Sequence, residues 1–154
     1  MILSKESIEY HVNEDIIGVT PPVKPEQYQP ASLDLRIGET TYHVGDDTYH
    51  KGINLAPGEF RLGHTQEYIT MPNHLAALVT GRSSIGRDGL MVHSVAGWID
   101  PGFEGQITLE LKNLADDYLS YYAGKRICQI IFIELDAPTD PYDGKYQGQM
   151  GPRK

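Results

Sequence analysis

Apolar residues fall at every second position in two segments of the chain. They are residues 32–37 (SLDLRI) and 106–112 (QITLELK). Because successive side chains of a strand point to opposite faces, this alternation predicts two strands that each bury one face. Residues 126–135 (RICQIIFIEL) are more continuously apolar, which predicts a strand buried on both faces, and residues 75–79 (LAALV) form a similar short buried run.

A helical pattern is confined to the N-terminal segment, where Ser4 can cap a helix and Ile8 and Val12 lie four residues apart. Turn sequences rich in Pro, Gly and Asn separate the apolar runs at spacings typical of an all-β barrel or sandwich. Residues 40–54 have a weak pattern and are expected to form a hairpin or an excursion. We therefore expect a single all-β domain over residues 1–154, with one short N-terminal helix.

Composition narrows the class of protein. The chain has 13 Lys and Arg against 21 Asp and Glu, and this net charge of −8 disfavours a protein that coats nucleic acid. No run approaches the roughly 18 to 20 apolar residues that cross a bilayer, and charges at Lys5 and Glu6 come too early for a secretion signal. We expect a cytoplasmic protein without membrane contact. The single cysteine, Cys128, cannot supply a multi-thiolate zinc site, and the six histidines lack metal-binding spacing, so we expect no metal held by the protein.

Residues 81–87 (GRSSIGR) combine two hydroxyl groups with two guanidinium groups between glycines. Arginine offers fork-shaped donors that match phosphate oxygens, and glycine lets the backbone approach a ligand, so this composition suits an anion site. The alternative is a solvated turn after the buried run of residues 75–79. The pattern alone favours neither interpretation over the other. The segment lacks the Gly-Lys-Ser/Thr ending of a P-loop.

Two carboxylates are candidate acid–base groups. Asp100 lies in the turn of residues 96–105 (AGWIDPGFEG), where a nucleobase could stack on Trp98. An ordinary Asp-Pro-Gly turn with Trp98 in the core explains the same residues and is the better account of this turn by itself. Glu110 lies mid-strand between apolar neighbours, where enclosure would raise its pKa as a general acid–base group requires. A glutamate on the exposed face of a half-buried strand gives the same pattern, and the pattern alone favours that interpretation.

The C-terminal segment, residues 142–154, is polar, glycine-rich and aromatic. It brings together aromatic, cationic and amide side chains that suit a flap closing over a nucleotide, namely Tyr142, Lys145, Tyr146 and Gln149. The alternative is a disordered polar terminus, and the segment left alone would be mobile.

Taken in order, five motifs resemble the dCTP deaminase branch of the trimeric dUTPase superfamily. They are residues 29–36 (QPASLDLR), 81–87 (GRSSIGR), 96–103 (AGWIDPGF) with 107–110 (ITLE), 124–130 (GKRICQI) and 144–149 (GKYQGQ). The match covers nearly the whole chain apart from about residues 40–70. The resemblance implies a distorted jelly-roll of β-strands, a dUTPase-like β-clip barrel, that forms a homotrimer with active sites between subunits.

The resemblance also implies deamination without zinc, which agrees with the single cysteine. By position, Glu110 is the expected base and acid that activates water at C4 of cytosine and protonates the departing amine, while Ser83 and Arg87 hold that water and the polarised base. The implied substrate contacts are triphosphate oxygens for Arg82 and Ser84, the base edge for the backbone of Val95 and Ala96, the phosphate end for Lys145, Tyr146 and Gln149, and further substrate contacts for Trp98 and Tyr142. Mg²⁺ is expected to arrive bound to the triphosphate, and dTTP is the candidate feedback inhibitor.

One departure from the family pattern bears on the product. Single-activity deaminases commonly carry His-Arg before the Ile-Asp-Pro-Gly turn, whereas this chain has Gly97 and Trp98, which is similar to the bifunctional dCTP deaminase/dUTP diphosphatases. Asp100 stands where dUTPases carry the aspartate that activates water for the α-phosphorus. We rank conversion of dCTP to dUMP and pyrophosphate first, which would supply dUMP for thymidylate synthesis. A deaminase that stops at dUTP ranks second and a dUTP diphosphatase third, and a catalytically idle nucleotide-binding regulator is the alternative from another class.

Overall fold

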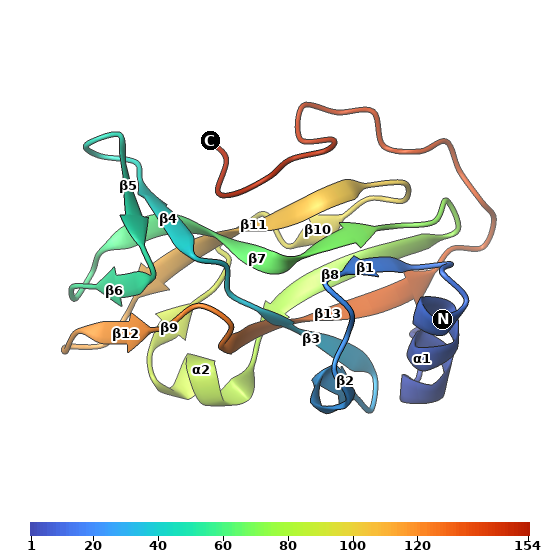
Figure 1. Cartoon of the computed structure of the whole chain (residues 1–154), viewed down its shortest axis with the longest axis horizontal. Helices are drawn as coiled ribbons and strands as arrows, with labels where there is room; N and C mark the ends of the chain where they lie inside the picture. The colour runs from blue at the N-terminus through green and yellow to red at the C-terminus, as the bar shows by residue number, and fades with distance from the viewer.

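Two antiparallel sheets form the body of the molecule in a computed structural model that describes all 154 residues (Figure 1). In the first sheet the strand order is β5-β4-β7-β11-β9, and β1 pairs with the far end of β7. Its strands are β1 (Gly18–Thr20), β4 (Thr40–His43), β5 (Thr48–Lys51), β7 (Phe60–Thr70), β9 (Leu90–Met91) and β11 (Glu104–Asn113).

The second sheet has the order β10-β8-β13-β3-β2. Its strands are β2 (Tyr28–Gln29), β3 (Ser32–Arg36), β8 (Leu75–Gly81), β10 (Trp98–Ile99) and β13 (Arg126–Glu134). A separate two-stranded ribbon pairs β6 (Ile53–Leu55) with β12 (Leu119–Tyr121). One hydrophobic cluster contains residues of both large sheets, so the core lies between them.

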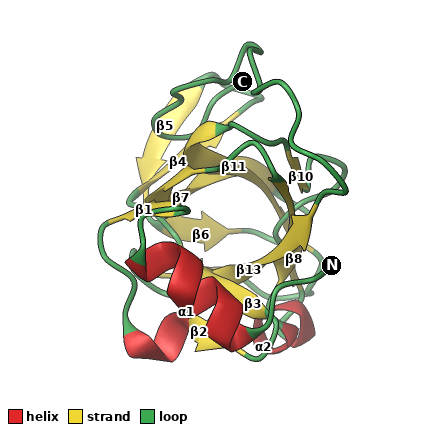
Figure 2. Cartoon of the chain, turned by 90° about the vertical axis from the view of Figure 1, so that its right-hand side faces the viewer, coloured by secondary structure: helices red, strands yellow, loops and turns green.

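The helical segments are short. Helix α1 (Lys5–Asn13) begins after Ser4, whose hydroxyl accepts a hydrogen bond from the Ser7 amide, and this confirms the predicted N-terminal helix and its cap. Helix α2 (Ser83–Arg87) follows β8, and the 3-10 turn η1 (Pro25–Gln27) precedes β2. Figures 1 and 2 place both helices on the side of the molecule that holds β2 and β3, whereas the C-terminal tail runs on the opposite side, beyond β11.

Strand β11 confirms the predicted alternation of buried and partly exposed residues. Ile107, Leu109 and Leu111 are buried, and the residues between them are half-buried. The weakly patterned region of residues 40–54 contains the β4–β5 hairpin, in which Thr40 pairs with Lys51. Both segments therefore take the structures that their patterns predict.

Strand β3 differs from its prediction, because all five of its residues are buried rather than those of one face. It lies between β13 and β2, and the side chains of Glu67, Arg82 and Arg126 contact its polar residues. The two charged residues on its polar face, Asp34 and Arg36, are each paired with an opposite charge. The prediction was wrong because tertiary neighbours can bury a polar face when they satisfy its charges.

Strand β13 differs in the other direction. It was predicted to be buried on both faces, yet Ile131 and Ile133 are only half-buried, whereas Ile130 and Phe132 are fully buried. Only one face of β13 therefore contacts the core. A continuous apolar run does not distinguish these two cases, because an isoleucine on the outer face leaves the run unbroken.

A buried ion pair joins the two sheets. Glu67 of β7 is fully buried, and its Oε1 lies 2.6 Å from Nε of Arg36 in β3. The Arg36 amide donates to the other carboxylate oxygen at 2.8 Å, and the Gln27 side chain donates to Oε1 at 3.0 Å. The carboxylate is thus fully hydrogen-bonded, as a charge removed from water requires.

Candidate active site

A cavity of about 420 Å³ lies between β10, β11 and the C-terminal tail. Glu110 contributes from β11, Trp98 from β10 and Asp100 from the turn that follows β10. Seven of the residues predicted from the sequence line this cavity, and they are Ala96, Trp98, Asp100, Glu110, Tyr142, Tyr146 and Gln149. Val95 adjoins the group through its hydrogen bond to Glu110.

One oxygen of Glu110 is held by the loop that precedes β10. Oε2 accepts hydrogen bonds from the amides of Ser94, Val95 and Ala96 at 2.7, 2.9 and 3.2 Å, and from the Ser94 hydroxyl at 3.0 Å. Oε1 accepts no hydrogen bond from the chain, so it is the oxygen available to a ligand in the cavity. The carboxylate is therefore oriented by its own subunit before any substrate binds.

The pKa of Glu110 differs from the prediction. Partial burial raises this pKa, but hydrogen bonds from Val95, Ser94 and Ala96 together outweigh burial, and the net effect lowers the pKa below the ordinary value of a glutamate. The sequence pattern predicted a raised pKa for Glu110 if the strand enclosed it, and by itself favoured an exposed glutamate. The expectation of a raised pKa failed because donors from a separate loop converge on Oε2, and the alternation of β11 contains no information about that loop.

The turn after β10 holds the second carboxylate. The indole N–H of Trp98 donates to Oδ1 of Asp100 at 3.0 Å, and Trp98 is 53% exposed. The interpretation in which Trp98 fills the core is therefore wrong. The ring stands at the cavity and orients Asp100, which leaves Oδ2 available to a second partner.

The C-terminal tail pairs with β11 and closes one side of the cavity. Gln149 is buried, its backbone oxygen accepts from the Gln106 amide at 3.0 Å, and its side chain donates to the Gln106 backbone oxygen at 2.7 Å. The Arg153 amide donates to the Thr108 hydroxyl at 3.3 Å. In the structure β11 supplies hydrogen-bond partners for the tail. Lys145 does not line the cavity, and its Nζ lies 5.2 Å from the centre of the Tyr146 ring.

The predicted anion segment, residues 81–87, lies outside the cavity that holds Glu110. Ser83, Ser84 and Arg87 are exposed on α2, and none of them lines the cavity that holds Glu110. Arg82, just before α2, forms an ion pair with Asp34, in which Nε and Oδ2 are 2.8 Å apart. Within one chain, then, the structure separates residues 82–87 from the two carboxylates.

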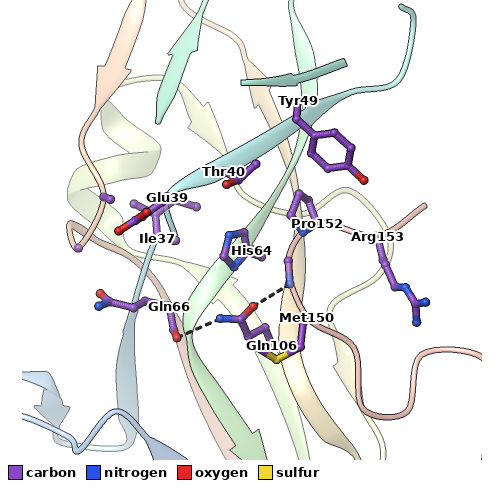
Figure 3. A pocket seen from close by; sticks show the side chains of 14 residues that line it. Ile37, Glu39, Thr40, Tyr49, His64, Gln66, Gln106, Met150, Pro152 and Arg153 are labelled. Atoms are coloured by element: carbon purple, nitrogen blue, oxygen red, sulfur yellow. Dashed lines mark hydrogen bonds between the residues drawn. The ribbon is translucent and has the colours of Figure 1, made fainter. Parts of the chain in front are cut away.

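A larger cavity, of about 720 Å³, lies on the other side of the tail and shares only Arg153 with the first. Figure 3 shows Gln106 between the two segments that it joins: its side chain donates to the Gln66 backbone oxygen at 3.3 Å and accepts from the Gly151 amide at 2.7 Å. Apart from Arg153, no residue that lines the cavity around Glu110 also lines this larger cavity. We therefore place the candidate active site in the smaller cavity.

Two kinds of site residue were not predicted from the sequence: a residue that binds Glu110, and basic residues that line the cavity. Ser94 binds Glu110 directly, and its position next to Val95 was the available signal. Arg153 and Lys154 bring positive charge to the cavity, and their signal was the basic end of the tail. No group of three or more His, Cys, Asp or Glu side chains in the chain is arranged to hold a metal ion, and no helix has the length and apolar character needed to cross a bilayer.

Two packed antiparallel sheets define a jelly-roll domain. Its candidate site is a cavity that two carboxylates and the aromatic and cationic tail line. A family model described as dCTP deaminase-like matches residues 2–135, and the chain belongs to that family.

Individual relatives agree with this assignment. The chain is 39% identical to a "dCTP deaminase, dUMP-forming" of Methanothermobacter thermautotrophicus, with 99% of this chain and 91% of that protein covered. A protein of the same description from Aquifex aeolicus is 42% identical, with 98% and 92% covered. The crystal structure of the 2′-deoxycytidine 5′-triphosphate deaminase of Agrobacterium tumefaciens superposes with a TM-score of 0.73 at 24% identity, and the match covers 85% of this chain but 47% of that one.

Proposed function

We propose that the protein converts dCTP and two waters to dUMP, ammonia and pyrophosphate, by deamination followed by cleavage of the dUTP formed. The observation that carries this proposal is the presence of Glu110 and Asp100 in one cavity, each with one oxygen held by the protein and the other available. Relatives described as dUMP-forming dCTP deaminases support the same reaction.

In the first step Glu110 acts as the proton carrier. Its lowered pKa keeps the carboxylate ionised at neutral pH, so Oε1 can accept a proton from a water as the water oxygen attacks C4 of cytosine. The protonated acid then passes a proton to the amine at C4, which leaves as ammonia. The low pKa of the carboxyl favours this return of the proton, because the amine is the stronger base.

In the second step Asp100 orients a water toward the α-phosphorus of dUTP. The Trp98 N–H fixes one carboxylate oxygen, so the other can accept a hydrogen bond from that water. Attack by the water oxygen breaks the bond between the α-phosphorus and the bridging oxygen, and pyrophosphate leaves. Tyr142, Tyr146 and Gln149 enclose the nucleotide from the tail side.

We infer that a second subunit completes each site. Residues 82–87 carry the donors that the triphosphate and the reacting water need, yet they lie outside the cavity of their own chain. Their exposure on α2 leaves them free to enter the cavity of a neighbour. A homotrimer, as the family resemblance implies, would provide three such sites. Ser83 and Arg87 would then approach Glu110 of the adjoining subunit, with Arg82 and Ser84 at the phosphates.

We infer that a Mg²⁺ ion enters the site bound to the triphosphate, since a hard cation held by phosphate oxygens and waters needs few protein ligands. When bound there, Mg²⁺ would neutralise part of the phosphate charge. Arg153, which lines the cavity, would bind part of the remaining charge, and Lys145, which lies against the Tyr146 ring, would approach it from the tail. We also propose that dTTP, which shares the sugar and triphosphate of the substrate, inhibits by binding the same cavity.

The decisive experiment incubates the protein with dCTP and Mg²⁺ and separates the nucleotides. Formation of dUMP without accumulated dUTP is the expected result. Accumulated dUTP would point to a deaminase that stops there, and unreacted dCTP with hydrolysed dUTP would point to a diphosphatase. A protein that binds dCTP but converts neither nucleotide would contradict the proposal and favour a binding regulator. Addition of dTTP to the same assay tests inhibition.

Substitutions assign the two carboxylates. Glu110→Gln should abolish ammonia release while dCTP binding survives, because the amide keeps the shape but cannot carry the proton. Glu104→Gln, on the exposed end of the same strand, is the matched control and should retain activity. Asp100→Asn should reduce pyrophosphate release more than ammonia release. Equal loss of both products would show that Asp100 only supports the site.

A further inference from the structure

The first motif of the chain, residues 29–36, has no part in the proposed chemistry. It lies largely on β3, which carries a buried carboxylate, Asp34, that contacts Arg82 of the predicted anion segment. Asp34 is 1% exposed. Its Oδ2 lies 2.8 Å from Nε of Arg82 and 3.1 Å from Nη1 of Arg126. A carboxylate in this position is tolerated because two guanidinium groups compensate its lost hydration.

Arg82 is held through two of its three guanidinium nitrogens. Nε contacts Asp34, and Nη1 donates to the backbone oxygen of Arg126 at 3.2 Å. The side chain nevertheless remains 23% exposed. Because a guanidinium group has five N–H donors and Nη2 of Arg82 makes no hydrogen bond to the chain, donors remain for a phosphate oxygen. Arg82 is thus oriented by its own subunit and still able to bind an anion.

A second polar link joins β3 to the residue before Arg82. The Ser32 hydroxyl donates to Oε1 of Gln129 at 3.0 Å, and Nε2 of Gln129 donates to the backbone oxygen of Gly81 at 3.3 Å. In the sheet, Gln129 of β13 pairs with Asp34 on one side and with Thr80 on the other. Two side chains of β3 therefore hold the junction between β8 and α2.

The charges of this cluster favour an anionic ligand. Two guanidinium groups against one carboxylate leave a net positive charge around Asp34. A phosphate bound at Arg82 would therefore meet a cluster that Asp34 has oriented but not neutralised. Arg126 supplies the additional charge, and its side chain is also tied to the backbone oxygen of Glu26.

We propose that Asp34 is a positioning residue for the triphosphate: it fixes the guanidinium group of Arg82 in the orientation that binds the outer phosphates. The proposal rests on the proposed function, in which Arg82 binds the triphosphate of dCTP in an adjoining subunit. Asp34 acts through Arg82 and does not touch the substrate. This proposal assigns a role to Asp34, which is the acidic residue of the first motif.

The test replaces Asp34 with Asn, which keeps the shape and removes the charge. We expect the KM for dCTP to rise about tenfold, kcat to change less than about threefold, and the inhibition constant of dCMP to stay unchanged, because dCMP lacks the outer phosphates. Asp46→Asn is the matched control, since Asp46 is an exposed carboxylate paired with His43. It should leave all three constants unchanged.

Two further arms separate positioning from general stability. In an Arg82→Ala background, Asp34→Asn should raise the KM no further, because its effect passes through Arg82. An equal rise in both backgrounds, or a lowered Tm with unchanged KM, would overturn the proposal. If Asp34→Asn does not fold, Arg82→Lys tests the same pair, because it keeps the positive charge but removes the guanidinium group that Asp34 orients. The KM for dCTP should then rise severalfold, and an unchanged KM would overturn the proposal.

A readout independent of turnover distinguishes the two proposals. In NMR spectra of the intact protein, the Arg82 Nε–H should exchange slowly with solvent, and Asp34→Asn should accelerate that exchange. If the unsubstituted protein does not convert dCTP, the proposed function fails while this measurement still tests the link between Asp34 and Arg82. If it does convert dCTP and Asp34→Asn leaves the KM and the exchange rate unchanged, only the positioning proposal fails.

Discussion

At the scale of single residues, the ionisation of Glu110 decides what the cavity can do. Three amides and one hydroxyl converge on a single carboxylate oxygen, and their combined effect exceeds that of partial burial. The carboxylate is therefore ionised at neutral pH before it accepts a proton from the reacting water. Its chemistry depends on the loop at residues 94–96 as much as on its own strand.

Ser94→Ala tests this dependence. The substitution removes one donor from Oε2, so the pKa of Glu110 should rise toward the ordinary value of a glutamate. Because the reaction needs the ionised base, the acid limb of the pH profile of kcat/KM for dCTP should move to higher pH by the same amount. Stability should follow the same sign: the lowered pKa stabilises the folded chain above the unfolded-state pKa, and that stabilisation is lost as the pH falls through the folded pKa.

Ser120→Ala is the control, because its hydroxyl bonds Asn54 on the separate ribbon of β6 and β12. It should leave the pH profile unchanged. A Ser94→Ala profile identical to that of the unsubstituted protein would mean that the amides alone set the pKa of Glu110.

At the scale of elements, the turn after β10 connects the core to the tail. Gly102 has a φ of +74°, and a Cβ placed there would lie 2.4 Å from Cβ of Pro141. The Tyr142 amide donates to the Pro101 backbone oxygen at 2.8 Å, so the start of the tail rests on this turn. A left-handed glycine and a close approach of two segments occur at the same position.

Gly102→Ala should therefore destabilise the fold by about 2 kcal/mol and also weaken nucleotide binding, since both the backbone and the tail must shift. Urea unfolding and the KM for dCTP measure the two effects. Gly58→Ala is the matched control, with a φ of +75° and no atom near the added Cβ. It should cost about 1 kcal/mol and leave the KM unchanged. Equal effects of the two substitutions on KM would show that the contact with Pro141 does not position the tail.

At the scale of the whole molecule, the buried pair of Glu67 and Arg36 joins the two sheets. Glu67→Gln should lower the free energy of unfolding by about 3–5 kcal/mol, because it leaves the buried guanidinium without a compensating charge. Denaturant unfolding followed by circular dichroism measures this. Glu9→Gln breaks an exposed pair with Lys5 and should cost less than about 0.5 kcal/mol. A small loss at Glu67 would show that water reaches Arg36 once the pair is broken.

The proposed trimer predicts complementation between two inactive chains. Glu110→Gln and Arg87→Ala chains, each without activity alone, should regain activity when refolded together, because some sites then combine an intact Glu110 with an intact Arg87 from another subunit. Random mixing in trimers restores roughly one quarter of the sites. A mixture of Ser83→Ala and Arg87→Ala chains is the control and should regain no activity, since both residues lie on one α2 and every site then lacks one of them. Absence of activity in the first mixture would place the whole site within one subunit.

The sequence by itself determined the features that depend on local order. Residues close together in the chain form each of these signals. The alternation in β11 and the cap at Ser4 predicted strands and the short helix of an all-β domain. The five motifs predicted the family and the two candidate carboxylates. Periodicity and capping operate within a few residues, so no knowledge of distant neighbours is needed.

Only the tertiary structure decided which distant segments meet. Contacts between residues far apart in sequence bury both faces of β3 and lower the pKa of Glu110. Such contacts also place the tail beside β11. The same is true of Asp34, whose partners Arg82 and Arg126 come from two other parts of the chain. The energy of a charge is set by the donors and the solvent around it, and folding alone brings those donors together.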